Sequence, residues 1–155
     1  MSLAITERVI SSPEYLAART IFLYASMAEE PDTAGLIERT LADGKRVYLP
    51  RIEGERMNLV SFDGTTPTTR NRYGIEEPQG DPASVIPDLA VIPLLAFDRD
   101  KHRLGRGKGY YDRFLAGYSG RSVALAFSVQ EVDRVPTEEY DLSPQAVFTD
   151  KERIG

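Results

Sequence analysis

The residues with the clearest capacity for chemistry lie in one segment, residues 98–113, with the sequence DRDKHRLGRGKGYYDR. This segment holds six of the chain's 19 lysines and arginines and three acidic residues, so it carries a net charge of +3. The rest of the chain carries −8, since the whole chain has a net charge of −5. A concentrated positive patch on an acidic protein favours a site for a specific anion over diffuse binding of polyanions.

The centre of the segment is the run Gly105-Arg106-Gly107-Lys108-Gly109. Glycines at alternate positions let the backbone approach a ligand closely and turn its N–H groups toward one point. Arg106 and Lys108 add charge, and arginine suits bidentate contact with phosphate. A helix expected over about 110–116 adds the unpaired N–H groups of its first turn. We interpret the segment as a phosphate-binding loop; a solvated, flexible surface loop is the alternative.

Two better-known phosphate-binding motifs do not match this segment. The P-loop requires glycine at position 102, which is His102, and a serine or threonine after the lysine, where Gly109 stands. The dinucleotide-binding motif requires glycine at position 110, which is Tyr110. Neither motif therefore explains the glycines.

Four side chains around the glycines are further candidates. Asp112 suits Mg²⁺, which binds one or two carboxylates together with phosphate oxygens, although an acid in the first turn of a helix also complements the helix dipole. Tyr110 and Tyr111 could stack on a flat ligand or pack in the core, and we expect core packing for at least one of them. We expect His102 to lie exposed at the tip of the loop.

The elements that must position this segment follow from the apolar pattern. Short β-rich runs predict strands, and helical spacing predicts helices. The expected strands cover residues 20–24, 46–50, 57–62, 89–97, 122–127 and 146–149, and the expected helices cover residues 3–12, about 34–41 and about 110–116.

The order of these elements indicates the fold class. Strands that alternate with helices or long crossovers indicate an α/β protein with a mostly parallel sheet. Residues 89–97 are the most apolar run and the best candidate for the central strand. The candidate loop then leaves the carboxyl end of that strand, where open α/β sheets bind ligands. Gly44 is placed to end the second helix, and residues 63–87 are expected to form a long loop, either functional or disordered.

Composition narrows the possible functions. A chain of 155 residues is one domain, and its acidity argues against general nucleic-acid binding. Without cysteine and with a single histidine, the chain has no thiol nucleophile, disulfide or polyhistidine zinc site. No run approaches the roughly 18 apolar residues of a membrane span, and the N-terminus lacks the features of a signal peptide, so we expect a cytoplasmic protein.

The segment Arg103-Leu104-Gly105-Arg106-Gly107-Lys108-Gly109-Tyr110-Tyr111-Asp112 resembles the signature of the 5-formyltetrahydrofolate cyclo-ligases, also called methenyltetrahydrofolate synthetases. The resemblance extends to residues 44–51, 73–78, 91–98 and 135–141, and covers the chain from about residue 3 to its end. It implies a single domain over residues 1–155. The implied fold is a three-layer, Rossmann-like α/β fold of the NagB/RpiA/CoA-transferase type, with helices on both faces of a mostly parallel sheet.

The resemblance also implies a reaction. Members of this family convert 5-formyltetrahydrofolate to 5,10-methenyltetrahydrofolate with ATP and Mg²⁺, and release ADP and phosphate. ATP phosphorylates the formyl oxygen, N10 of the folate attacks the activated carbon, and phosphate departs. Such chemistry depends on positioning and charge neutralisation more than on a strong base. The implied partners are a folate and ATP, with neither a nucleic acid nor a membrane, and we expect a monomer.

The family's site residues carry over by position. The implied catalytic residues are Arg106, Lys108 and Tyr110. The implied ATP-binding residues are Arg103, Leu104, Gly105, Arg106, Gly107, Lys108, Gly109, Tyr110 and Tyr111. The implied folate-binding residues are Ala25, Glu30, Arg106, Gly107, Lys108, Gly109 and Tyr110. The implied Mg²⁺ ligands are Asp112 and Asp141. An ordinary acid before a helix is the alternative for Glu30, and Glu29 is its neighbouring rival.

The chain departs from the family pattern at two places. Members usually begin with a basic helix whose Lys-x-x-x-Arg pattern reaches ATP, and this chain begins after that point, so we expect a weaker interaction with ATP. Arg8 or Lys45 could supply the charge instead. Tyr140 stands where members commonly carry a histidine beside the residue that matches Asp141.

Two other functions remain open at this stage. One is a catalytically weak or inactive protein of the same fold that binds folate or nucleotide. The other is an RNA-binding module that uses the Arg/Gly loop, although no other basic or aromatic RNA-binding signature supports it.

Overall fold

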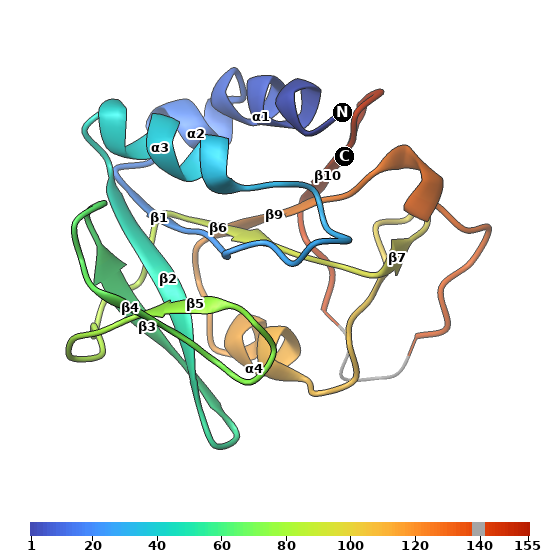
Figure 1. The fold of residues 1–155 in the computed structure, drawn as a ribbon. Coiled ribbons are helices and arrows are strands. Elements are labelled where there is room, and N and C mark those ends of the chain that lie inside the picture. The colour runs from blue at the N-terminus through green and yellow to red at the C-terminus, as the bar shows by residue number, and fades with distance from the viewer. Residues whose placement is uncertain (138–141) are drawn as a thin grey trace.

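A computed structural model describes residues 1–137 and 142–155 (Figure 1). In this described part of the chain, the main sheet has seven strands in the spatial order β11-β10-β9-β6-β1-β2-β3. Strands β1, β2, β6, β9 and β10 run parallel, and β3 and β11 pair antiparallel at the two edges. The strands of this sheet are β1 (Thr20–Phe22), β2 (Arg46–Glu53), β3 (Arg56–Phe62), β6 (Leu89–Ile92), β9 (Arg121–Leu125), β10 (Ala146–Phe148) and β11 (Arg153–Ile154).

Strand order fixes where a ligand can bind. Counted along the chain, the parallel strands lie in the spatial order 2-1-3-4-5, so the direction of winding reverses between β1 and β6. At such a reversal the connections leave the two carboxyl ends in opposite directions, and a crevice opens between them. The expected mostly parallel α/β sheet is confirmed, with β6 as its central strand.

The sheet buries both faces, as its alternating side chains show. Leu89 and Val91 of β6 belong to one buried cluster, and Ala90 and Ile92 belong to another on the opposite face. Helices cover both clusters and make three layers (Figure 1). Three helices, α1 (Ser2–Ile10), α2 (Pro13–Ala17) and α3 (Ala34–Ala42), cover the first face, and α4 (Tyr110–Ala116) covers the second.

The N-terminal helices differ from expectation at one point. The first helix ends near Ser12 as expected, but Pro13 does not simply break the helical path. Ser12 caps a second short helix, since its Oγ accepts the N–H of Tyr15 at 3.3 Å and Pro13 occupies the first helical position. Gly44 has φ of +78° just after α3, as expected of a residue that ends a helix.

Residues 63–87 do not form a loop throughout. Two short strands, β4 (Thr68–Arg70) and β5 (Glu76–Pro78), pair as an antiparallel hairpin. Asn71 shapes its turn, because its Oδ1 accepts the N–H groups of Tyr73 and Ile75 at 2.9 and 3.1 Å. The carboxylate of Glu77 accepts the N–H of Ile52 at 2.8 Å and so fixes the hairpin against β2. Neither strand carries an apolar alternation in its sequence, so the sequence pattern missed both.

A second small hairpin precedes the glycine loop. Strands β7 (Ala96–Phe97) and β8 (Arg103–Leu104) pair antiparallel, and Asp98 closes the turn between them. The buried carboxylate of Asp98 accepts the N–H groups of Asp100, His102 and Val135 at 3.0–3.1 Å. The hairpin therefore returns the chain to the carboxyl end of β6. Among the described residues, no helix is both long and apolar enough to cross a membrane.

The packing of α3 yields a stability prediction. Leu36 of α3 is 1% exposed and packs in the core on the face of the sheet that α1, α2 and α3 cover. We expect Leu36→Ala to lower the free energy of unfolding by about 2–5 kcal/mol, because it removes buried methyl groups and leaves a cavity. Urea unfolding measures this change. Leu3→Ala on α1 is the matched control, since Leu3 is 71% exposed, and a change near zero is expected. Equal losses in the two variants would contradict this account of the core.

Candidate functional site

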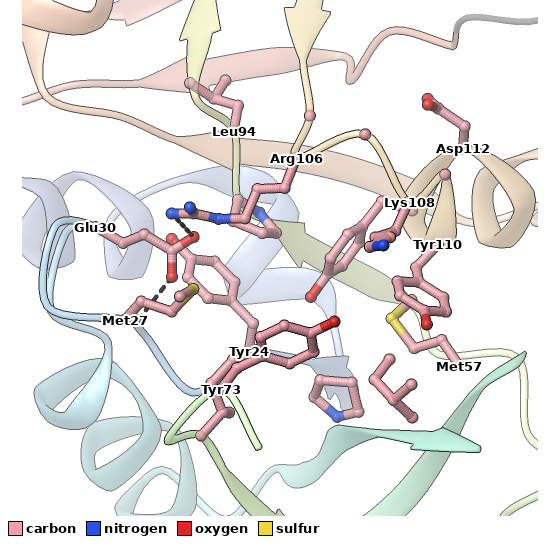
Figure 2. Close-up of a pocket in the computed structure, with 18 of the residues that line it drawn as sticks. Tyr24, Met27, Glu30, Met57, Tyr73, Leu94, Arg106, Lys108, Tyr110 and Asp112 are labelled. Atoms are coloured by element: carbon pink, nitrogen blue, oxygen red, sulfur yellow. Dashed lines mark hydrogen bonds and ion pairs between the residues drawn. The ribbon is translucent and has the colours of Figure 1, made fainter. Parts of the chain in front are cut away.

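A cavity of about 600 Å³ opens at the reversal of strand order (Figure 2). Its walls come from the segments that follow β1 and β6, from β2 and β3, from the β4–β5 hairpin, and from the glycine loop with the start of α4. This volume lies in the range of small-molecule and cofactor sites. The cavity is therefore where the sequence and the topology both placed the site.

The cavity brings together the residues that the sequence singled out. The lining includes residues 103–112 and all seven expected folate contacts, namely Ala25, Glu30, Arg103, Leu104, Gly105, Arg106, Gly107, Lys108, Gly109, Tyr110, Tyr111 and Asp112. Asp141, the second expected metal ligand, lies outside the described residues, so its position is not part of this geometry.

Backbone geometry explains two of the glycines. Gly107 and Gly109 have φ of +89° and +71°, a region that side chains with a Cβ rarely adopt. Gly109 directly precedes α4, and a Cβ there would lie 2.9 Å from a guanidinium nitrogen of Arg113. Anchors on β2–β3 hold this start of α4, since Tyr110 Oη donates to the Gly54 carbonyl at 3.0 Å and Arg113 to the Glu55 carbonyl at 2.8 Å.

Arg103 connects the strand end to the helix. Its side chain is 4% exposed, and its guanidinium donates to the Pro93 carbonyl at 3.0 Å and pairs with Asp112 Oδ1 at 3.3 Å. The guanidinium also lies over the ring of Tyr111, 5.8 Å from the centroid. Tyr111 in turn stacks on Phe22 of β1, so the expected core packing holds for this tyrosine. Arg103 thus positions the Asp112 carboxylate at the cavity wall.

Arg106 faces two acids across the cavity. One guanidinium nitrogen lies 3.1 Å from Glu29 Oε1. The same nitrogen lies 3.5 Å from Glu30 Oε2 (Figure 2). Glu30 is 5% exposed, and its other oxygen accepts the N–H of Met27 at 2.7 Å. Burial raises the pKa of Glu30, whereas the Met27 N–H and the Arg106 charge act to lower it. Glu30 is therefore a buried acceptor, and Glu29 is an exposed partner of Arg106.

The sequence analysis missed the apolar side chains of the cavity lining. These side chains come from the segments after β1 and β6, from β2 and β3, and from the β4–β5 hairpin, and include Met27, Ile52, Met57, Tyr73, Ile75 and Leu94. Residues 73–78 carried a family signal in the sequence, but nothing in that signal assigned them to a ligand. A cavity with charged and apolar walls suits a ligand with an anionic part and a flat apolar part.

Three cationic candidates lie elsewhere. His102 is only partly exposed, does not line the cavity, and its Nδ1 lies 3.0 Å from Asp98 Oδ2. Arg8 donates to the Thr149 carbonyl at 2.9 Å, and Lys45 donates to the Ala18 carbonyl at 2.7 Å. Neither side chain reaches the cavity, so both are wrong as sources of charge for ATP.

One other group of metal-ligating side chains is present in the described residues. Asp98, Asp100 and His102 have ligand atoms within 4.8 Å of one another. The oxygens of Asp98 already accept three backbone N–H groups and face His102 Nδ1. This group therefore closes the β7–β8 turn.

Comparisons with known proteins fit this geometry. A family model described as the 5-formyltetrahydrofolate cyclo-ligase family matches residues 1–150. The 5-formyltetrahydrofolate cyclo-ligase of Escherichia coli K12 is 35% identical over 152 residues, which cover 92% of this chain and 84% of that protein.

Solved structures give the same result. The NMR structure of the 5,10-methenyltetrahydrofolate synthetase of Aquifex aeolicus superposes with a TM-score of 0.86 at 30% identity, over 98% of this chain and 79% of that one. The synthetase of Mycoplasma pneumoniae has a TM-score of 0.73 at 22% identity, over 97% of this chain and 85% of that one, and supports the fold alone.

The burial of Glu30 yields a pH prediction. The unfolded chain ionises this carboxyl near its ordinary pKa of 4.5, and the folded chain ionises it at higher pH, so the folded state holds more protons between the two values. Relative to Glu30→Gln, the wild type should therefore lose stability as pH rises from 4.5 through the raised pKa, and the difference should then level off. Urea unfolding of both proteins across this range measures the difference. Glu38→Gln on the exposed face of α3 controls for the loss of one charge. A difference that grows in favour of the wild type with rising pH would contradict the prediction.

Proposed function

The chain belongs to the 5-formyltetrahydrofolate cyclo-ligase family, and on this premise we propose that it is a ligase that converts 5-formyltetrahydrofolate to 5,10-methenyltetrahydrofolate with ATP. The observation that carries the proposal is the cavity itself, whose cationic glycine loop faces an apolar wall. The loop suits the phosphates of ATP, and the apolar wall suits the flat rings of a folate. Both substrates then meet at the carboxyl ends of β1 and β6.

The reaction requires activation of a poor leaving group. In the proposed sequence the formyl oxygen attacks the γ-phosphorus of ATP, and the bond from that phosphorus to the bridging oxygen of ADP breaks. The N10 lone pair then attacks the formyl carbon, N10 releases its proton, and the carbon–oxygen bond breaks with departure of inorganic phosphate. The products are the 5,10-methenyl cation, ADP and phosphate, so atoms and electrons balance.

The protein contributes position and charge to these steps. Arg106 and Lys108 neutralise charge on the transferring phosphoryl group, and the backbone around Gly107 and Gly109 approaches the phosphates closely. Tyr110 is held by its hydrogen bond to Gly54 and lies where the two substrates meet. Arg106 must leave Glu29 and Glu30 to reach a phosphate, and the higher charge of a phosphate favours this exchange.

The folate position follows from the other side of the cavity. Glu30 offers a buried carboxylate to the N–H donors of the substrate's heterocycle, and Ala25 lies on the same side after β1. We also propose that the enzyme acts as a monomer. Water is limited at this end because the apolar side chains of the wall surround it.

One side chain of the cavity, Asp112, is a suitable ligand for Mg²⁺. Mg²⁺ binds one or two carboxylates together with substrate phosphates, and Asp112 presents a carboxylate at the loop wall. Its Oδ1 contacts Arg103 at 3.3 Å, and we propose that the same carboxylate would hold the metal. Asp141 is proposed as the second ligand on the resemblance alone. Bound there, the metal supplies charge neutralisation for the phosphates.

Removing Arg106 tests the assignment of the loop. We expect Arg106→Ala to raise the KM for ATP about ten- to hundredfold, because it removes a charge-assisted contact. The absorbance of the methenyl product, followed against ATP concentration, measures this change. Arg39→Ala is the matched control, since Arg39 pairs with Asp43 on the surface of α3. If Arg106→Ala kept the wild-type dependence on ATP, the loop would not hold the phosphates.

Replacing Asp112 tests the metal site. We expect Asp112→Asn to shift the Mg²⁺ concentration for half-maximal activity upward by about tenfold or more, since a neutral amide is a weaker ligand. Activity titrated with MgCl₂ measures the shift, and thermal unfolding of the metal-free protein checks that the fold survives. Asp100→Asn, in the group that closes the β7–β8 turn, is the control. Superimposable titrations of wild type and Asp112→Asn would exclude Asp112 as a ligand.

A further inference from the structure

Tyr24 is a polar residue in the cavity that the mechanism above does not use. It lies two residues after the end of β1, at the point where the strand order reverses. Its side chain is 2% exposed and lines the cavity on the same side as Met27 and Glu30 (Figure 2). Neither composition nor spacing distinguished it from an ordinary core tyrosine.

The hydroxyl of Tyr24 has no hydrogen-bond partner within residues 1–137 and 142–155. Buried polar groups in native proteins are nearly always paired, so an unpaired one next to a cavity points to a ligand that completes it. Burial, with Glu30 and Tyr111 adding to it, raises the pKa of Tyr24 well above its ordinary value, so the group is an O–H donor at neutral pH. The cavity therefore contains an unused donor.

Glu30 and Arg106 define what this donor can meet. Glu30 is an acceptor that suits the adjacent N–H donors of a heterocycle. Arg106 is a second donor near Glu30, but its guanidinium already contacts both Glu29 and Glu30. A hydrogen bond to an acceptor beside those N–H groups is thus left to Tyr24.

We propose that the Tyr24 hydroxyl binds the substrate by donating a hydrogen bond to the ring carbonyl oxygen beside the N–H group that Glu30 accepts. This inference rests on the proposed function, because the folate heterocycle carries a ring carbonyl next to its N–H and amino donors. Glu30 and Tyr24 together then form hydrogen bonds along one edge of that ring. A ring with an amino group in place of the carbonyl binds more weakly.

In this proposal, a movement of Arg106 opens access to the hydroxyl. The hydroxyl is closed to water in the unliganded protein, so a side chain near it must move before a ligand makes contact. Binding of ATP would move Arg106, because the phosphates compete with Glu29 and Glu30 for its guanidinium. Its glycine neighbours, including Gly107 at φ +89°, permit the displacement. Folate binding should therefore tighten when a nucleotide is present.

The test compares wild type and Tyr24→Phe. Calorimetry gives the Kd of 5-formyltetrahydrofolate with a non-hydrolysable ATP analogue present, and we expect the variant to bind about tenfold more weakly, or about 1.4 kcal/mol. The unliganded variant should melt about 2–6 °C higher, because it no longer buries an unpaired hydroxyl. A purely structural role of Tyr24 would not weaken binding while raising the melting temperature.

Tyr15→Phe is the matched control in the same core cluster. The Tyr15 hydroxyl donates to Asp43, so this variant should melt lower and bind folate as the wild type does. The 4-amino counterpart of the substrate lacks both the ring carbonyl and the adjacent ring N–H, so Glu30 also discriminates against it. The part of the 4-oxo preference that depends on Tyr24 is therefore the difference between the two proteins, and we expect the preference to be about tenfold smaller in Tyr24→Phe than in wild type.

Two results separate this inference from the proposed function. A wild type that neither binds nor cyclises 5-formyltetrahydrofolate overturns both. A wild type that cyclises it, together with a Tyr24→Phe variant of unchanged Kd and unchanged 4-oxo preference, overturns the role of Tyr24 alone.

Discussion

Burial of both faces of the sheet is the constraint on which the rest of the structure depends. Strands such as β6 carry apolar side chains on both sides, so helices must cover both faces, and the chain meets this need by reversing its winding between β1 and β6. The reversal parts the carboxyl ends of these strands and opens the cavity there. The position of the site thus follows from how the core is covered.

The elements around the cavity are held by polar contacts that few surface loops possess. Arg103 joins the end of β6 to the first turn of α4 through Pro93 and Asp112. Asp98 holds the preceding turn and the segment at Val135 through backbone N–H groups. These buried charges are paired, as burial requires, and they fix the backbone on both sides of the glycine loop. Because Arg103 and Asp98 hold the backbone on both sides, the side chains of Arg106 and Lys108 are not needed to hold the loop in place.

Charge inside the cavity is already arranged before any ligand binds. Arg106 contacts Glu29 and Glu30. In the unliganded protein, the guanidinium that we propose binds phosphate therefore neutralises the buried carboxylate of Glu30. Each group is expensive to bury alone, and their contact offsets part of that cost. Under the proposed function, ATP draws Arg106 away from Glu30, and the Glu30 carboxylate then becomes available to the donors of the second substrate. This exchange links the two substrates through one guanidinium.

The sequence by itself determined the α/β class, the place of the central strand and the glycine loop from Arg103 to Asp112, because apolar runs and glycine spacing act locally. The apolar run at residues 89–97 predicted one strand, but the structure divides it into β6 and the short β7, because residues 96–97 pair with β8 instead. The sequence did not reveal the β4–β5 hairpin, whose strands lack an apolar pattern. Only the tertiary structure decided that Arg103 is buried against Asp112 and that Tyr24 faces the cavity with an unpaired hydroxyl. These properties depend on contacts between segments far apart in the chain, and no local pattern encodes them.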